Sequence, residues 1–169
     1  MKEHICKAKR VDNGKWIEGY YMNYKGFSSD NAENHTILPV CENGLLASRA
    51  IAILPETVCR CTGKNYMNGE IAYQGDVYEN PGCGVVFVLK YGTYTAYCPV
   101  DNDYMDSVGF YAEAVGYPQM PIGDLNTYAL KIGNVFDNPE LLETDMEENK
   151  RVKRNRQINK AFWETVKGD

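Results

Sequence analysis

The stretch from Leu54 to Val77 constrains the fold of this chain more than any other part of the sequence. It holds two short runs of β-favouring residues, 57–62 and 70–73, with the dipeptide Asn68-Gly69 between them. Asn-Gly between such runs is the strongest local signal for a hairpin, because both residues tolerate positive φ. A turn at Gly75-Asp76 then leads into a third run, as at the corners of small barrels. The stretch therefore predicts three short strands joined by tight turns.

The N-terminal part of the chain has the same character. Residues 5–11 and 15–22 flank the turn sequence Asp12-Asn13-Gly14 and predict a hairpin with one face in water. Residues 35–41 are interrupted by Pro39, which lacks the amide hydrogen that an interior strand must donate, so we expect an edge strand there. With an apolar run that ends near Leu54, these segments predict a small β lobe over residues 1–54.

The C-terminal part begins with the most strongly β-favouring run of the chain, residues 84–91. Gly92 separates this run from residues 93–98, and the two predict a second hairpin. Residues 99–124 are rich in Asp, Pro and Gly and predict a long excursion with one short strand near 110–115. Residues 128–136 then return as a closing strand.

These segments together predict a mainly β fold, with the N-terminal lobe (1–54), an SH3-like β-barrel (55–137) and a C-terminal α-helix (138–169). The thirteen tyrosines and fifteen glycines agree with many short strands between turns. The helix is expected to begin at Asn138-Pro139-Glu140, with Asn as the cap and Pro at the first helical position. The expected barrel core consists of Val58, Ile71, Val77, Val86, Val88, Ile132 and Val135.

The charge of the C-terminal helix changes sign along its length. Residues 140–149 carry a net charge of −5 and residues 150–169 a net charge of +5, while residues 1–139 carry −5. An apolar set on one side of the helix could contact a partner protein or another copy of the chain: Val152, Ile158, Phe162, Trp163 and Val166. A basic set could instead contact phosphates: Lys150, Arg151, Lys153, Arg154, Arg156 and Lys160.

No catalytic, metal or cofactor site follows from the residues that could build one. Cys59 and Cys61 point to one face of a strand, but zinc sites use a longer spacer and a second pair, so we interpret them as ordinary buried thiols. The two histidines, His4 and His35, have no evident nucleophile beside them. Three aspartates at 101, 103 and 106 lack the glycine and final glutamate of a calcium loop, which favours a solvated turn.

The beginning of the chain and its hydropathy bear on the compartment. Residues 1–6 contain no apolar segment of the kind that a signal peptide needs, and no window approaches the length of a membrane span. The six cysteines are too scattered for a secreted disulfide scaffold, and we expect them to be reduced. A cytoplasmic protein without membrane contact is expected.

Several ordered motifs resemble the signature of the YopX family. They are Leu54-Pro-Glu-Thr-Val58, Thr62-Gly63, Asn68-Gly-Glu-Ile71, Tyr73-Gln-Gly-Asp-Val77 and Gly133-Asn-Val-Phe-Asp-Asn-Pro-Glu-Leu141, preceded by Gly14-Lys-Trp-Ile-Glu-Gly-Tyr20. The excursion over 99–127 and the basic tail fall outside this pattern. The resemblance implies a phage or prophage protein in the bacterial host cytoplasm, of a family without an established activity, and offers no catalytic residues to transfer.

Two hypotheses about function remain open at this level. The leading one is a non-enzymatic accessory module that binds a protein partner or forms a homo-oligomer through the apolar residues of the tail. The alternative is a nucleic-acid-binding barrel whose aromatic residues stack on bases while the basic tail contacts phosphates. An enzyme that uses acids such as Asp76 is the weakest option, since no base or nucleophile accompanies them.

Overall fold

A computed structural model describes residues 4–25, 33–40, 49–98 and 100–142 of the chain. The expected fold class is confirmed, because the protein is mainly β and contains two antiparallel sheets and a small C-terminal helix. The chain divides into two compact units, one formed by Met1–Asn65 with Glu70–Gln74 and one by Tyr66–Gly69 with Gly75–Asp169. Within the described ranges, no helix combines the length and hydropathy that crossing a membrane requires.

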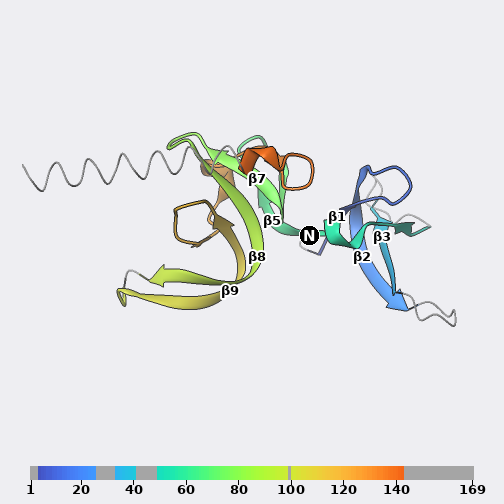
Figure 1. Ribbon diagram of the computed structural model, residues 1–169, viewed down its shortest axis with the longest axis horizontal. Coiled ribbons are helices and arrows are strands. Elements are labelled where there is room, and N and C mark those ends of the chain that lie inside the picture. The colour runs from blue at the N-terminus through green and yellow to red at the C-terminus, as the bar shows by residue number, and fades with distance from the viewer. Residues whose placement is uncertain (1–3, 26–32, 41–48, 99, 143–169) are drawn as a thin grey trace, which may run out of the picture. The chain divides into compact units, whose positions relative to one another are not determined.

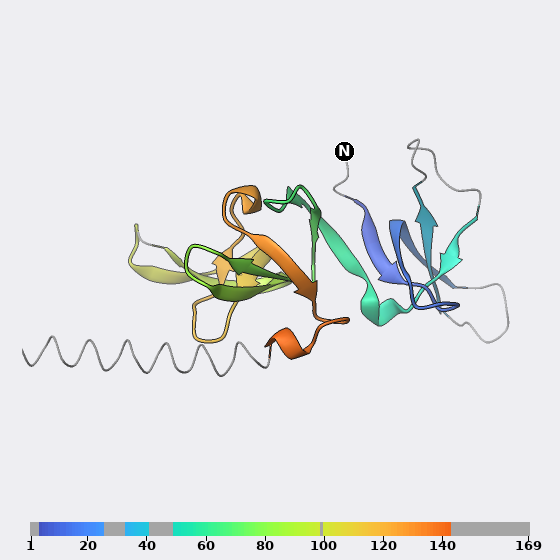
Figure 2. The same ribbon diagram turned by 90° about the horizontal axis from the view of Figure 1, so that it is seen from above.

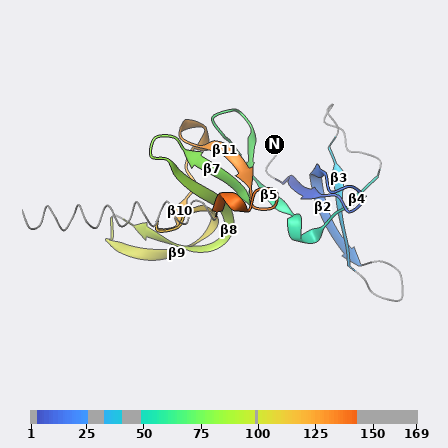
Figure 3. The same cartoon turned by 45° about the horizontal axis from the view of Figure 1, so that its top comes forward.

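The first unit is built on a six-stranded sheet with the order β4-β3-β2-β1-β5-β6. Figure 3 labels β2, β3, β4 and β5 of this sheet. Its strands are β1 (Cys6–Lys9), β2 (Trp16–Lys25), β3 (Glu33–Pro39), β4 (Ile51–Ala52), β5 (Cys59–Asn65) and β6 (Ile71–Tyr73), and a short 3-10 helix, η1 (Pro55–Thr57), precedes β5. The β1–β2 hairpin confirms the turn prediction, because Gly14 has a φ of 68° and its N–H donates to the Arg10 carbonyl.

The position of β3 differs from the edge strand expected at Pro39. β3 lies between β2 and β4, so it is an interior strand of the sheet. Among the described residues, β4 pairs only with Thr36 and Ile37, so Pro39 lies beyond the part of β3 that β4 covers, and its missing N–H costs no bond to β4. The core of this unit includes a cluster of Ala8, Ile37 and Ile53, with Ile17, Tyr21 and Val58 packed against it.

The second unit is a five-stranded sheet that curves into a half-barrel, with the order β10-β9-β8-β7-β11 (Figure 1). Its elements are β7 (Asp76–Asn80), β8 (Val85–Cys98), β9 (Asp103–Glu113), β10 (Met120–Pro121), a short 3-10 helix η2 (Leu125–Thr127) and β11 (Leu130–Asn134). β11 pairs with β7, so the predicted closing strand is present and joins the far edge of the sheet (Figure 2).

The predicted hairpin between residues 84–91 and 93–98 is wrong. Residues 85–98 form one strand, β8, which pairs with β9 along eleven consecutive positions. Gly92 lies opposite Gly109 in this ladder, and their φ values of 151° and 157° are conformations that other residues rarely adopt. The glycine at 92 therefore accommodates a distorted pair inside a long strand, and the short strand expected near 110–115 is the end of this same ladder.

The core of the second unit lies on one face of β8. Val85, Phe87 and Leu89 are buried together with Val77, Tyr78 and Leu125, and the rings of Tyr78 and Phe87 stack 5.3 Å apart. Among the predicted core residues, Val77 is confirmed. Val86, Val88, Ile132 and Val135 are only half-buried, while Val58 and Ile71 belong to the first unit.

The limits of the predicted segments also differ from the structure. β5 pairs with β1, which groups residues 59–65 with the N-terminal sheet rather than with the barrel expected from residue 55. At the C-terminus, helical structure begins at Glu140, as the Asn138-Pro139 signal predicts, and continues to Leu142, the last described residue.

Candidate functional site

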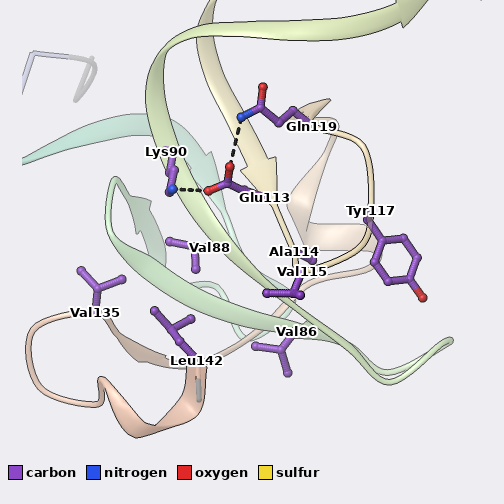
Figure 4. Close-up of a pocket in the computed structure, with 10 residues that line it drawn as sticks. All are labelled: Val86, Val88, Lys90, Glu113, Ala114, Val115, Tyr117, Gln119, Val135 and Leu142. Carbon is purple, nitrogen blue, oxygen red and sulfur yellow. Dashed lines mark hydrogen bonds and ion pairs between the residues drawn. The ribbon is translucent and has the colours of Figure 1, made fainter. Parts of the chain in front are cut away.

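A groove lies on the face of β8 opposite the core of the second unit. Side chains alternate between the two faces of a strand, so Val86, Val88 and Lys90 point into the groove while their neighbours fill the core. Figure 4 shows Val88 and Val86 beside Val135 and Leu142, which come from the segment after β11. The groove has a volume of about 410 Å³, within the range of cavities of roughly 300–1,000 Å³ that hold ligands.

The far wall of the groove comes from the end of β9 and the connection to β10. Its residues are Glu113, Ala114, Val115, Tyr117 and Gln119. Val115 keeps 40% of its surface exposed, so an apolar side chain stands in solvent at the rim. Most of the surface inside the groove is therefore aliphatic.

A network around Asn134 holds the wall that follows β11. The Asn134 side-chain oxygen accepts hydrogen bonds from the backbone N–H groups of Phe136 and Asp137, at 2.9 and 3.0 Å. Its amide group donates to the Asp137 carboxylate at 2.7 Å. These bonds fold the chain back at Val135 and lead it into the helix that carries Leu142.

The polar end of the groove is a neutralised pair. Lys90 forms an ion pair with Glu113, and the Gln119 side chain donates to Glu113 at 3.0 Å (Figure 4). The side-chain oxygen of Gln119 (Oε1) also accepts a hydrogen bond from the backbone N–H of Thr95 at 3.2 Å. The ion pair with Lys90, together with the bond from Gln119, lowers the pKa of the Glu113 carboxyl below its usual value. The pair stays charged near neutral pH and presents no unbalanced charge to a ligand.

The chemistry of this lining is suited to apolar contacts. The residues that line it include no histidine, cysteine or serine, so the groove lacks the usual pairing of a nucleophile with a base. Aliphatic walls beside one satisfied polar cluster are typical of a surface that accepts apolar side chains or an apolar ligand.

A second exposed surface lies on the outer part of the β8–β9 ladder, which we call the distal arm (residues 91–98 and 103–110). Residues 85, 87 and 89 of β8 lie on the same side of the strand as residues 91, 93, 95 and 97. The first three fill the core, whereas the last four lie on the distal arm and are exposed. We call this surface the aromatic face, and its residues are Tyr91, Thr93, Thr95, Tyr97, Tyr104, Asp106, Val108 and Phe110.

The rings on the aromatic face are arranged in cross-strand pairs. Tyr97 and Tyr104 meet edge to face with centroids 5.4 Å apart, and Tyr91 meets Phe110 at 4.9 Å. Tyr104 is 61% exposed and Val108 is 74% exposed. Cross-strand pairs of this kind stabilise a ladder, but here they also present large apolar groups to solvent.

The charged side chains of the distal arm and of the connection between its strands (99–102) are all acidic. Residues 91–109 contain Asp101, Asp103 and Asp106 and no lysine or arginine. Asp106 accepts a hydrogen bond from the Thr95 hydroxyl at 3.1 Å, and Asp101 accepts from the Cys98 thiol. The solvated turn expected for the three aspartates holds only for Asp101, because Asp103 and Asp106 belong to strand β9.

Asp76, the acid of the Gly75-Asp76 turn, lies in the core of the second unit. Its side chain is 0% exposed, and one carboxylate oxygen lies 3.7 Å from the Lys131 ammonium. The same oxygen accepts a hydrogen bond of 3.4 Å from the Tyr66 hydroxyl. A carboxylate enclosed in this way cannot reach a substrate, which supports a structural role.

The cysteines and histidines in the described part of the chain do not converge on a site. Cys59 and Cys61 are both buried, and the Cys59 thiol donates to the Thr57 carbonyl. His35 bonds through its Nδ1 atom to the Tyr21 hydroxyl at 2.7 Å on the first sheet. Across the described ranges, no three residues of the types His, Cys, Asp and Glu gather closely enough to hold a metal ion.

Both predicted contact sets of the C-terminal segment lie outside the described residues. The apolar set is Val152, Ile158, Phe162, Trp163 and Val166, and the basic set is Lys150, Arg151, Lys153, Arg154, Arg156 and Lys160. The groove and the aromatic face were not predicted from the sequence. For the groove, a signal was available in the run Val85–Leu89, because a strand that is apolar at every position is typically covered on both faces.

Comparison with known proteins leaves the family of this chain undetermined. No protein-family model matches the chain, and the search of curated proteins found no match either. The resemblance to the YopX family therefore stays a prediction from the motifs themselves.

Proposed function

We propose that this protein is a non-enzymatic binding module that captures a lysine- and arginine-rich segment of a partner protein on its aromatic face. The observation that carries the proposal is the combination of cross-strand aromatic pairs on an exposed face with an arm whose only charged side chains are acidic. Aromatic rings attract guanidinium and ammonium groups by cation–π interaction, and nearby carboxylates add long-range attraction to the same groups.

The same observation disfavours the nucleic-acid alternative for this surface. Stacked bases bring phosphates with them, and Asp106 lies on the same face as the rings, while Asp101 and Asp103 add negative charge to the same arm. The net charge of −5 for residues 1–139 acts in the same direction. The motif resemblance, taken with this surface, supports a phage or prophage accessory protein of the bacterial cytoplasm as the setting.

The test measures binding of a fluorescein-labelled oligo-arginine peptide to the full chain by fluorescence anisotropy. Replacing Tyr97 and Tyr104 by Leu should weaken binding about tenfold, because each exposed cation–π contact contributes about 0.5–1 kcal/mol. The substitution leaves the net charge unchanged, so general attraction between opposite charges cannot explain the loss. Tyr20→Leu, which removes an exposed ring from the first unit, is the matched control and should have no effect.

Two outcomes would contradict this function. One is equal affinity of the Tyr97→Leu/Tyr104→Leu variant and the wild type for the peptide. The other is tighter binding of a labelled single-stranded oligonucleotide than of the peptide at physiological salt, which would favour the nucleic-acid-binding alternative.

A further inference from the structure

The groove exposes an apolar strand face that a monomeric protein normally covers. β8 runs Val85-Val-Phe-Val-Leu89, and one face of this run already fills the core of the second unit. The other face, Val86 and Val88, looks into about 410 Å³ of unfilled space among the described residues. Strands with apolar residues on both faces belong to sheets that are covered on both sides.

The chain itself continues from the rim of this space. Leu142 lines the groove, and residues 143–169 follow it directly. A segment tethered at the edge of a site acts at an effective concentration on the order of millimolar. Even weak apolar contacts of that segment can therefore compete with ligands in solution.

The composition of the segment matches the groove in polarity, and the basic part of the segment is opposite in charge to the body of the chain. Its apolar residues include Phe162 and Trp163, the two largest side chains after Leu142 that the sequence offers. Residues 150–169 carry a net charge of +5, whereas residues 1–139 carry −5, so attraction favours the return of the segment to the body of its own chain. The neutral Lys90–Glu113 pair at the end of the groove does not oppose that return.

We propose that the groove binds the chain's own C-terminal segment, residues 150–169. In this arrangement Phe162 and Trp163 insert into the groove and contact Val86, Val88 and Val115. This contact is independent of the aromatic face and its partner. A second copy of the chain, or a small apolar ligand, is the competing occupant that the experiment distinguishes.

The experiment is a double-mutant cycle on the full chain, followed by thermal unfolding. Phe162→Ser/Trp163→Ser should lower the melting temperature by about 4 °C, the shift expected for a loss of apolar contacts in a protein of this size. Gln157→Ser/Asn159→Ser, a polar pair in the same segment, is the control and should have no effect. In a Val115→Glu background, where the groove carries a new charge, the Phe162/Trp163 change should have little further effect.

Val108→Glu is the matched control for the groove variant, because it makes the same replacement on the distal arm, where Val108 is the more exposed of the two valines. In that background the full shift should persist. A second readout is the emission of Trp163, obtained by subtracting the spectrum of a Trp163→Phe variant. It should lie at short wavelength in the wild type and move to longer wavelength in Val115→Glu.

Three outcomes would overturn the proposal. The first is an unchanged melting temperature for Phe162→Ser/Trp163→Ser, and the second is an equal shift with and without Val115→Glu. The third is a fall in molar mass by light scattering when Phe162 and Trp163 are replaced, which would place the segment on a second copy. If the groove variants fail these tests while the tyrosine variants lose peptide binding, the proposed function stands and the intrachain contact does not.

Discussion

Asp76 offers the sharpest test of how the second unit is held together. Its carboxylate is fully buried and lies 3.7 Å from the Lys131 ammonium. At an effective dielectric constant of about 20, this separation corresponds to an attraction of roughly 4.5 kcal/mol before the cost of removing both groups from water. Replacing Asp76 by Ala removes the attraction and leaves the partly buried Lys131 charge in place, so we expect a loss of about 3–4 kcal/mol in the free energy of unfolding.

The assay is urea denaturation of the full chain, monitored by tyrosine fluorescence and circular dichroism. Asp76→Asn keeps the shape of the side chain and should lose less, about 2 kcal/mol, because the amide oxygen can still accept the bond from the Tyr66 hydroxyl. Asp124→Asn, at an exposed position of the same unit, is the control for the change in charge and should stay within about 0.5 kcal/mol of the wild type.

The double variant Asp76→Ala/Lys131→Met isolates the pair itself. If the ion pair carries the effect, the double variant should be more stable than the sum of the single losses predicts, by about 1–3 kcal/mol. Additive losses, or a single Asp76→Ala variant as stable as the Asp124→Asn control, would refute the reasoning and reopen a functional role for this acid.

Two further predictions concern the β8–β9 ladder. Because its partners hold the Glu113 pKa below the unfolded value of about 4.3, the ionised form stabilises the fold above that pH and the contribution disappears as the pH falls through the folded pKa. The melting temperature of the wild type should therefore exceed that of Glu113→Gln by a constant amount from about pH 8 to pH 5.5, and the difference should shrink below about pH 5; a difference that grows in acid would contradict this. Gly92→Ala should cost about 1–3 kcal/mol through backbone strain alone, since nothing lies within 4 Å of the added carbon, whereas Gly123→Ala, at an ordinary φ, should be nearly neutral by the same urea assay.

The parts of the fold that were predictable depend on local turn chemistry. Asp12-Asn13-Gly14 and Asn68-Gly69 both form the expected turns, and Gly69 has a φ of 82°. These turns were predictable because a tight turn needs a positive φ, which glycine adopts readily, so the residue type alone indicates the turn. The start of the helix after Pro139 is local in the same sense. Each of these predictions needed no knowledge of the rest of the chain.

The errors arise where the decisive partner is distant. Alternation normally tells which face of a strand is buried, but Val85–Leu89 is apolar throughout, so the core was assigned to Val86 and Val88 instead of their neighbours. Gly92 resembled a turn because its partner in the ladder, Gly109, lies far along the chain. The groove depends on the same missing information, since its walls come from segments that meet only in the folded unit.

The interleaving of the two units limits how this protein can be rearranged by recombination. Residues 66–69 belong to the second unit, although the strands on either side of them, β5 and β6, belong to the first. Tyr66, in this short insertion, is 1% exposed and its ring lies against that of Tyr78 in the second core. A fragment that begins at Gly75 would leave this tyrosine behind, and a fragment that ends before it would lose β6. No single cut in the sequence separates two intact halves, so a recombinant that keeps either unit whole has to take both.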